Sequence, residues 1–156
     1  LVQAVTLTGS TPAGKAVAAK AGAMLKKTVL ELGGSDPYLI LEDADLEPAV
    51  ETCVASRLIN GGQSCIAAKR FVVIESIRQR VEELFVEKMQ AYQMGDPLRE
   101  VVTLGPLARH DLRNMLHDQV THSLTHGAKL LMGSQALVSV FTLALVIARS
   151  VNILGA

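Results

Sequence analysis

The sequence has no tryptophan, and its aromatic residues amount to three phenylalanines and two tyrosines among 156 residues. Because 49% of the residues are hydrophobic, a core must be built almost entirely from aliphatic side chains. The chain also lacks an excess of charge, with 15 lysines and arginines against 15 aspartates and glutamates. A neutral balance gives no electrostatic reason to bind nucleic acid or an anionic membrane, so we expect neither partner. The length suffices for one ordinary domain.

Cysteine is scarce too, since the chain has only Cys53 and Cys65. Two cysteines do not make the dense framework of a secreted disulfide scaffold. They fit a reducing compartment, which predicts a cytoplasmic location. Residues 1–4 include no initiating methionine and no charged region ahead of an apolar one, so no signal peptide is indicated. We expect a chain that begins partway through a protein.

What the sequence does contain is an alternation of strand and helix patterns. Short β-branched, apolar runs alternate with segments whose apolar residues recur at helical spacing. This alternation predicts an α/β fold, with a layered, mostly parallel sheet and flanking helices. The expected strands are residues 2–7, 27–32, 38–41, 70–74 and, last in the chain, 129–132. The expected helices are 15–25, the segment from Asp45 to a stop at 60–62, 76–92 and 110–125.

Residues that accept hydrogen bonds from the first turn of a helix mark the expected helix starts. Thr11 is the expected cap of the first helix, with Pro12 at its first helical position. Asp45 and Ser76 are the expected caps of the second and third helices.

Residues 136–148 break this alternation, because the run contains no charge, no turn residue and no amphipathic period. The run is shorter than the ~20 residues that span a bilayer. Three interpretations stay open: a buried strand or helix, a segment that no longer follows the fold of the preceding chain, or a membrane anchor.

Residues 9–15 match a phosphate-binding P-loop until its final position, which is Ala16 where a serine or threonine would ligate magnesium. Pro12 also removes an amide that a phosphate cradle would use. The sequence therefore argues against a nucleoside-triphosphatase loop. A weaker prediction remains, because the Gly9-Ser10 turn opens a helix after a strand and can bind phosphate at the helix N-terminus.

Cys65 closes the glycine-rich run Asn60-Gly61-Gly62-Gln63-Ser64-Cys65. The glycines allow close approach of a ligand to a thiol, which makes Cys65 either a nucleophile or a structural cysteine. Glu31 ends an apolar strand, where a carboxylate is either solvated at a sheet edge or functional. Cys53 lies among apolar neighbours on the second helix and is expected in the core.

The four histidines of the chain lie in or just after the fourth expected helix. His122 and His126 are spaced as metal ligands on a helix, but no acidic residue between them completes a zinc-peptidase motif. A solvated helix face explains them, and we expect no metal site. The other two are His110 and His117.

Three blocks in order resemble the aldehyde dehydrogenase superfamily, and the separation of Glu31 from Cys65 agrees with the family's glutamate and cysteine. Framework residues at 32–37, 67–71, 94–97 and 104–108 look most like bacterial succinate-semialdehyde dehydrogenases. The resemblance covers residues 1–133 and implies three parts: the end of an NAD(P)-binding domain (1–30), the start of a catalytic domain (31–133) and an apolar tail (134–156) unlike the family. The three blocks are Leu7-Thr8-Gly9-Ser10-Thr11 with Gly14, Leu30-Glu31-Leu32-Gly33-Gly34 with Asp36-Pro37, and Gly62-Gln63-Ser64-Cys65.

The resemblance also implies an activity, the oxidation of an aldehyde to its carboxylic acid, with succinate semialdehyde as the expected substrate. Cys65 would attack the aldehyde, form a thiohemiacetal and then a thioester, and supply one oxyanion donor through its amide. Glu31 would be the base. The cofactor would be NAD or NADP, which the sequence does not distinguish, and members of the family form homo-oligomers. The implied binding residues are Gly9, Ser10, Leu32 and Gly33 for the cofactor and Ser64 and Ile66 for the aldehyde tunnel.

Other family features are missing from the sequence. The asparagine of the oxyanion hole and the lysine that holds the ribose would lie upstream of residue 1. A downstream glutamate-phenylalanine block is absent, which suggests a shifted reading frame or a truncated gene after Gly133. We therefore expect the chain alone to be inactive. Two other functions stay open for the chain. One is a non-catalytic remnant that associates through its apolar tail, and the other is an esterase or acyl carrier that uses Cys65.

Overall fold

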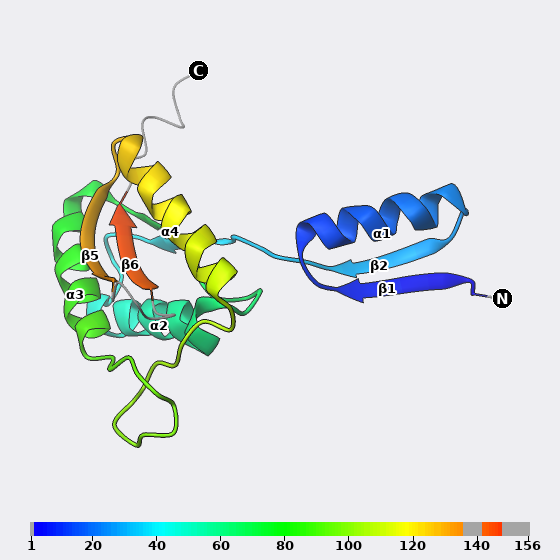
Figure 1. The fold of residues 1–156 in the computed structure, drawn as a ribbon. Coiled ribbons are helices and arrows are strands. Elements are labelled where there is room, and N and C mark those ends of the chain that lie inside the picture. The colour runs from blue at the N-terminus through cyan, green and yellow to red at the C-terminus, as the bar shows by residue number, and fades with distance from the viewer. Residues whose placement is uncertain (1, 136–141, 148–156) are drawn as a thin grey trace.

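The computed structural model describes residues 2–135 and 142–147, with side chains up to residue 132, and contains two units (Figure 1). The N-terminal unit consists of β1 (Ala4–Thr8), α1 (Thr11–Ala23) and β2 (Lys27–Glu31). β1 and β2 pair in parallel, from Ala4 opposite Lys27 to Thr8 opposite Glu31, and α1 packs on both strands. Residues 32–36 then lead to the larger unit, so the N-terminal unit stands apart at the end of a linker (Figure 1).

α1 begins at Thr11, one residue before the start that the expected cap implies. Ser10, not Thr11, is the N-cap: its backbone is extended, and its Oγ accepts a hydrogen bond from the amide of Ala13 at 3.4 Å. Pro12 follows in the first turn, where its missing N–H has no helical partner to lose. The expected cap at Thr11 is therefore wrong, because the serine side chain already serves the first free amides.

The linker starts with a side chain that lies directly over Gly14. A Cβ built at Gly14 would lie 2.6 Å from Cδ2 of Leu32, so the Leu32 side chain occupies the space above α1. Leu32 is half-buried and Gly14 is buried. The first residue of the linker therefore packs on α1.

The larger unit places a second parallel pair beside two helices. β3 (Pro37–Ile40) pairs with β4 (Arg70–Val73), and α2 (Leu46–Leu58) and α3 (Arg78–Gln90) pack on each other. Then α4 (His110–Thr125) and β5 (Lys129–Gln135) follow, and β5 pairs antiparallel with β6 (Thr142–Ile147). Figure 1 shows α4 and the β5–β6 pair alongside α2 and α3.

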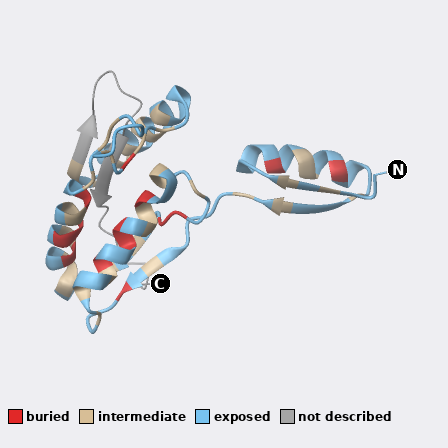
Figure 2. Cartoon of the chain, turned by 90° about the horizontal axis from the view of Figure 1, so that it is seen from below, coloured by how far each residue is buried: buried red, intermediate tan, exposed pale blue. Residues whose placement is uncertain are grey.

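The core of the larger unit lies between α2 and α3. Buried residues gather there and on the adjoining strand, whereas α1 buries only Gly14 and Ala21 (Figure 2). The core is aliphatic, as the composition predicts, except for three neighbouring aromatic rings. The ring centroid of Phe71 lies 5.5 Å from that of Tyr38 and 4.9 Å from that of Phe85. The buried cluster consists of Ile40, Val50, Cys53, Val54, Leu58, Val81, Leu84, Phe85, Met89 and Leu104.

The third helix also differs from its predicted boundaries. The expected cap, Ser76, lies inside a 3-10 turn at Glu75–Ile77, and the α-helix starts at Arg78 with Ile77 as its N-cap. Arg78 contacts Glu75 at 3.1 Å and Glu82 at 2.5 Å, so ion pairs rather than a serine cap join this turn to the helix. The second helix has Asp45 as its N-cap, as expected, but without a side-chain hydrogen bond.

The described strands form three separate pairs, two parallel and one antiparallel, so the expected α/β class is confirmed while part of the expected parallel sheet is antiparallel. The strand at 129–132 continues to Gln135 and is not the last, because β6 lies within the run 136–148. Residues 136–141 and 148–156 lie outside the described residues. Although apolar residues recur at helical spacing along α4, none of its residues is buried. No helix among the described residues has the length and apolarity to cross a membrane.

The fold makes one prediction for the core. Leu84 is 1% exposed between α2 and α3, so Leu84→Ala should lower the free energy of unfolding by about 2–5 kcal/mol. Leu98 is 92% exposed, so Leu98→Ala, the matched control, should change it by less than about 0.5 kcal/mol. Urea denaturation measures both, and equal losses would contradict the assigned core.

The Leu32 contact gives a second prediction, tested by two glycines of the same helix. Gly22→Ala meets no atom within 4 Å and should stabilise α1 by about 0.5–1 kcal/mol through helix propensity. Gly14→Ala should lose that gain, because its methyl group displaces Leu32. Amide hydrogen exchange across α1 measures the difference, and equal protection in both variants would show that Leu32 does not dock there.

Candidate active site

The loop that follows α2 has a backbone that favours glycine. Asn60, Gly61 and Gly62 have φ angles of 50°, 62° and 78°, in the left-handed region. A Cβ at Gly62 would also lie 3.0 Å from Cζ of Arg57. The two glycines therefore let the chain reverse tightly at the end of α2 and carry residues 63–68 back across it.

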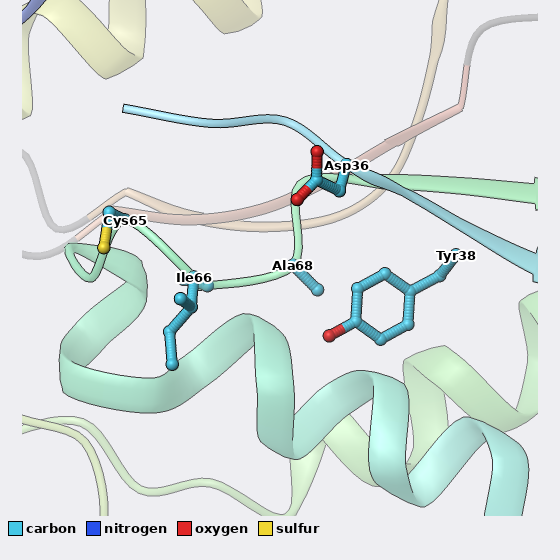
Figure 3. A pocket seen from close by; sticks show the side chains of 6 residues that line it. Asp36, Tyr38, Cys65, Ile66 and Ala68 are labelled. Carbon is cyan, nitrogen blue, oxygen red and sulfur yellow. The ribbon is translucent and has the colours of Figure 1, made fainter. Parts of the chain in front are cut away.

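This reversal presents Cys65 at an open cavity of about 280 Å³. The Cys65 and Ile66 side chains lie at one side of it. Asp36, the last linker residue, and Tyr38, on β3, lie at the other (Figure 3). Cys65 is exposed and Ile66 is 71% exposed. The predicted tunnel residue Ile66 therefore lines the cavity, whereas Ser64 is not among its lining residues, which are Asp36, Tyr38, Cys65, Ile66, Ala67 and Ala68.

The two thiols of the chain have opposite environments. Cys53 is 4% exposed in the α2–α3 core, as the sequence predicts, and burial raises the pKa of its thiol. A buried thiol with a raised pKa is a poor nucleophile. Cys65 is thus the thiol that a reactant can reach.

Hydrogen bonds tie the loop to its surroundings. Gln63 donates to the carbonyl of Asn60 at 3.1 Å through Nε2, and its Oε1 accepts from the amide of Ala108 at 2.9 Å. The amide of Ala67 donates to the carbonyl of Ser64 at 3.1 Å. Among the described residues, the amide of Cys65 donates to no group, which leaves it available to a ligand in the cavity.

Glu31 and the Gly9-Ser10 turn lie together at the carboxyl edge of the N-terminal unit. The Gly9 amide donates to the carbonyl of Glu31 at 3.0 Å, and Glu31 pairs with Thr8 in the parallel register. The Glu31 side chain is exposed and has neither an ion-pair nor a hydrogen-bond partner among the described residues. It does not line the cavity at Cys65.

The linker passes beside the cysteine loop of the candidate site. A Cβ at Gly34 would lie 3.8 Å from the carbonyl oxygen of Cys65, so the segment after Leu32 passes against the cysteine loop. A Cβ at Gly33 would meet nothing within 4 Å, which leaves that backbone open to a ligand. Because consecutive residues span at most about 3.6 Å, the backbone of Glu31 is within about 11 Å of Gly34.

The start of α1 has features that favour a phosphate group. The Gly9-Ser10 turn stands at the N-terminus of α1, where free amides and the helix dipole favour phosphate, and Gly9 has no side chain to block approach. Pro12 has no amide, and the Gly9 amide is already bonded to Glu31, so the cradle is smaller than in a P-loop. A single βαβ unit can hold only part of such a cofactor.

No group of three metal-ligating side chains exists in the described part of the chain. The rings of His122 and His126 lie 4.2 Å apart, and Nδ1 of His126 contacts the backbone carbonyl of His122 at 2.8 Å. Both histidines are exposed on the last turn of α4. Their rings interact with each other and with the helix terminus.

Two cations beside Cys65, which the sequence analysis did not single out, bond to the backbone of its loop. Lys69 donates to the carbonyls of Cys65 and Ala67. Arg57, on the last turn of α2, donates to the carbonyls of Gly62 and Ala68. Because these two side chains bond to backbone carbonyls, no partner side chain in the sequence indicates the contacts. Only the nearness of both cations to the Gly-Gly-Gln motif in the sequence could have suggested them.

The model of the aldehyde dehydrogenase family matches residues 1–148, and the chain belongs to that family. Among its relatives is the succinate semialdehyde dehydrogenase Sad of Escherichia coli, 55% identical over 134 residues, which are 86% of this chain and 29% of Sad. The NADP-dependent succinate-semialdehyde dehydrogenase of Mycobacterium avium is 49% identical over 136 residues, 87% of this chain and 29% of its own length.

Solved structures agree with this membership. An NADP-dependent enzyme of E. coli superimposes with a TM-score of 0.84 and 33% identity over 90% of this chain and 30% of its own. Aldehyde dehydrogenase C of Pseudomonas syringae, in complex with NAD+ and octanal, gives a TM-score of 0.82 and 32% identity over 86% and 28%. The chain thus has a partial aldehyde dehydrogenase fold and spans about 29% of the length of the curated relatives described above. The family match extends to residue 148, past the expected limit at Gly133.

The site predicts selective alkylation of the two thiols. Iodoacetamide at pH 8 should modify Cys65 in the folded chain and leave Cys53 unmodified, because Cys53 is buried and its pKa is raised. Peptide mass spectrometry quantifies both, with urea-unfolded chain as the control in which both cysteines react. Modification of Cys53 at the rate of Cys65 in the folded chain would contradict this environment.

Proposed function

We propose that this chain carries the nucleophile and the base of an NAD(P)-dependent aldehyde dehydrogenase. The observation that carries the proposal is Cys65, an exposed thiol at a cavity, on a loop whose cysteine amide has no partner among the described residues. A thiol and an unbonded amide on one residue suit attack on a carbonyl, since the amide can stabilise the oxyanion that the attack creates.

The chemistry at Cys65 follows from these groups. The thiolate sulfur bonds to the aldehyde carbon, and the carbonyl π electrons move to the oxygen, which the Cys65 amide stabilises as a thiohemiacetal anion. A bound nicotinamide dinucleotide supplies the acceptor for the hydride that this carbon must lose. Cys65 then holds the acyl group as a thioester. Attack of water on the thioester carbon forms the acid and returns the sulfur as a thiolate.

We assign Glu31 the role of general base, which accepts a proton from the hydrolytic water. Its carboxylate has no partner among the described residues, and Glu31 immediately precedes the linker, residues 32–36, which passes near the carbonyl of Cys65 at Gly34. Because Glu31 does not line the cavity, a role through a water molecule suits it better than direct contact with the thiol. Gly9 and Ser10 would hold the pyrophosphate side of the cofactor, and the backbone of Leu32 and Gly33 its nicotinamide amide.

The proposed substrate is succinate semialdehyde. Its support is the identity of about 50% to relatives named as succinate semialdehyde dehydrogenases, one of them NAD(P)-dependent and others NADP-dependent. Ile66 would contact the aldehyde at the cavity, and Ser64 would flank the nucleophile. We propose that the chain alone has no turnover, because one βαβ unit holds only part of the cofactor.

A second candidate function is association without catalysis. Leu39 on β3 and Val72 on β4 are 66% and 47% exposed, and Leu41, just after β3, is 52% exposed. This side of the strand pair therefore presents apolar side chains to solvent. Exposed apolar patches favour association with other chains. Size-exclusion chromatography over a range of concentrations separates the two candidates, since a monomer at all concentrations would contradict association.

A graft tests the catalytic proposal. Residues 1–133 would replace the matching stretch of E. coli Sad, and the grafted enzyme would be assayed with succinate semialdehyde and NAD(P)+. We expect turnover that Cys65→Ala abolishes and that Glu31→Gln lowers by about a hundredfold or more, the usual contribution of a general base. Cys53→Ala is the matched control and should retain activity in the folded fraction. An active graft that keeps its turnover in Cys65→Ala would contradict the proposal.

A further inference from the structure

Lys69 and Arg57 bind four backbone carbonyls around Cys65, and each contact is a charge-assisted hydrogen bond. Nζ of Lys69 lies 3.0 Å from the carbonyl oxygen of Cys65 and 2.9 Å from that of Ala67. Nη1 of Arg57 lies 2.8 Å from the carbonyl oxygen of Ala68, and its Nη2 is 3.5 Å from that of Gly62. The cations thus hold the loop on both sides of the cysteine.

Neither cation has a carboxylate partner among the described residues. Arg57 is half-buried, and burial lowers the pKa of its guanidinium. Removing a cation from water without an anion carries a desolvation penalty, which the carbonyl hydrogen bonds must offset. Gly62 is part of this arrangement, because a side chain there would collide with the guanidinium.

The bonded carbonyls set the direction of the amides beside them. In a trans peptide the C=O and N–H bonds point to opposite sides, and the chain has no cis peptide among its described residues. The carbonyl of Ser64 accepts from Ala67, which turns the Cys65 N–H the other way. The carbonyl of Cys65 faces Lys69, which turns the Ile66 N–H away from that cation. Both amides lack a partner in the described structure.

We propose that Lys69 and Arg57 are positioning residues for Cys65, which hold its loop by four carbonyls so that the thiol and the amides of Cys65 and Ile66 keep their directions. The inference rests on the proposed role of Cys65 as nucleophile. Neither cation touches the substrate in this role; each acts through the backbone of residues 62–68.

Amide hydrogen exchange in the present chain tests the positioning directly. The amides of Ala67 and Ala68 are bonded to the carbonyls of Ser64 and Ser56, at 3.1 and 3.0 Å, and report on the loop. In Lys69→Met or Arg57→Met they should exchange at least about tenfold faster, as expected for loss of a hydrogen bond to a charged donor. Amides of α3 should change less than about twofold, because the α2–α3 core is untouched.

The conservative and control variants separate positioning from general stability. Lys69→Arg keeps the charged donor and should restore the Ala67 rate to within about threefold of the original. Lys20→Met, on the exposed face of α1, should change none of these rates. Equal acceleration in α3 and in the loop would mean a global loss of stability, and unchanged loop amides would mean that the cations hold nothing; either result overturns the inference.

Kinetics of the Sad graft connect the loop to the reaction. Lys69→Met should lower kcat at least about tenfold with KM for the aldehyde unchanged, and Lys69→Arg should recover most of kcat. A rise in KM at constant kcat would overturn the positioning role. Should the graft itself retain turnover without Cys65, the proposed function fails, and the exchange rates in the present chain still decide whether the cations hold the loop.

Discussion

The packing of α2 against α3 is the contact on which the candidate site depends. Val50 and Val54 on α2 are almost fully buried against the side chains of α3, which include Leu84 and Met89. α2 ends at Leu58, and residues with left-handed backbone conformation just after it reverse the chain toward Cys65. Arg57, on the last turn of α2, donates a hydrogen bond to the carbonyl of Ala68, in the loop that follows the helix. A rigid hydrophobic contact thus fixes the origin of a loop that has almost no core of its own.

The groups assigned to the chemistry come from two units that meet through a short linker. Cys65 belongs to the larger unit, and Glu31 belongs to the βαβ unit. Leu32 docks over Gly14 at one end of the linker, and Gly34 lies against the carbonyl of Cys65 at the other. Gly34 therefore places the backbone of the linker in van der Waals contact with the backbone of the cysteine loop. This chain spans about 29% of the length of the E. coli relative Sad.

Much of the fold could be predicted because helices and strands leave periodic patterns. The span of α4 and the stop after α2 follow directly from such patterns. The caps at Thr11 and Ser76 were wrong because a neighbouring serine and the ion pairs of Arg78 decide those helix starts. β6 had no alternation to reveal it. At the site, Cys65 could be found from its glycine-rich motif. The roles of Lys69 and Arg57 could not be found, because both bond to backbone carbonyls that only the fold brings close. Every residue has such a carbonyl, so the sequence does not mark the ones that are bonded.

The central claim is that Cys65 is the nucleophile of an aldehyde oxidation. The most direct measurement is acid quenching of the Sad graft within its first turnovers with succinate semialdehyde and NAD(P)+, followed by peptide mass spectrometry. We expect a succinyl thioester on the peptide that contains Cys65, absent from Cys65→Ala and present in Cys53→Ala. An acyl group on another residue, or full turnover by Cys65→Ala without any acyl peptide, would contradict the claim.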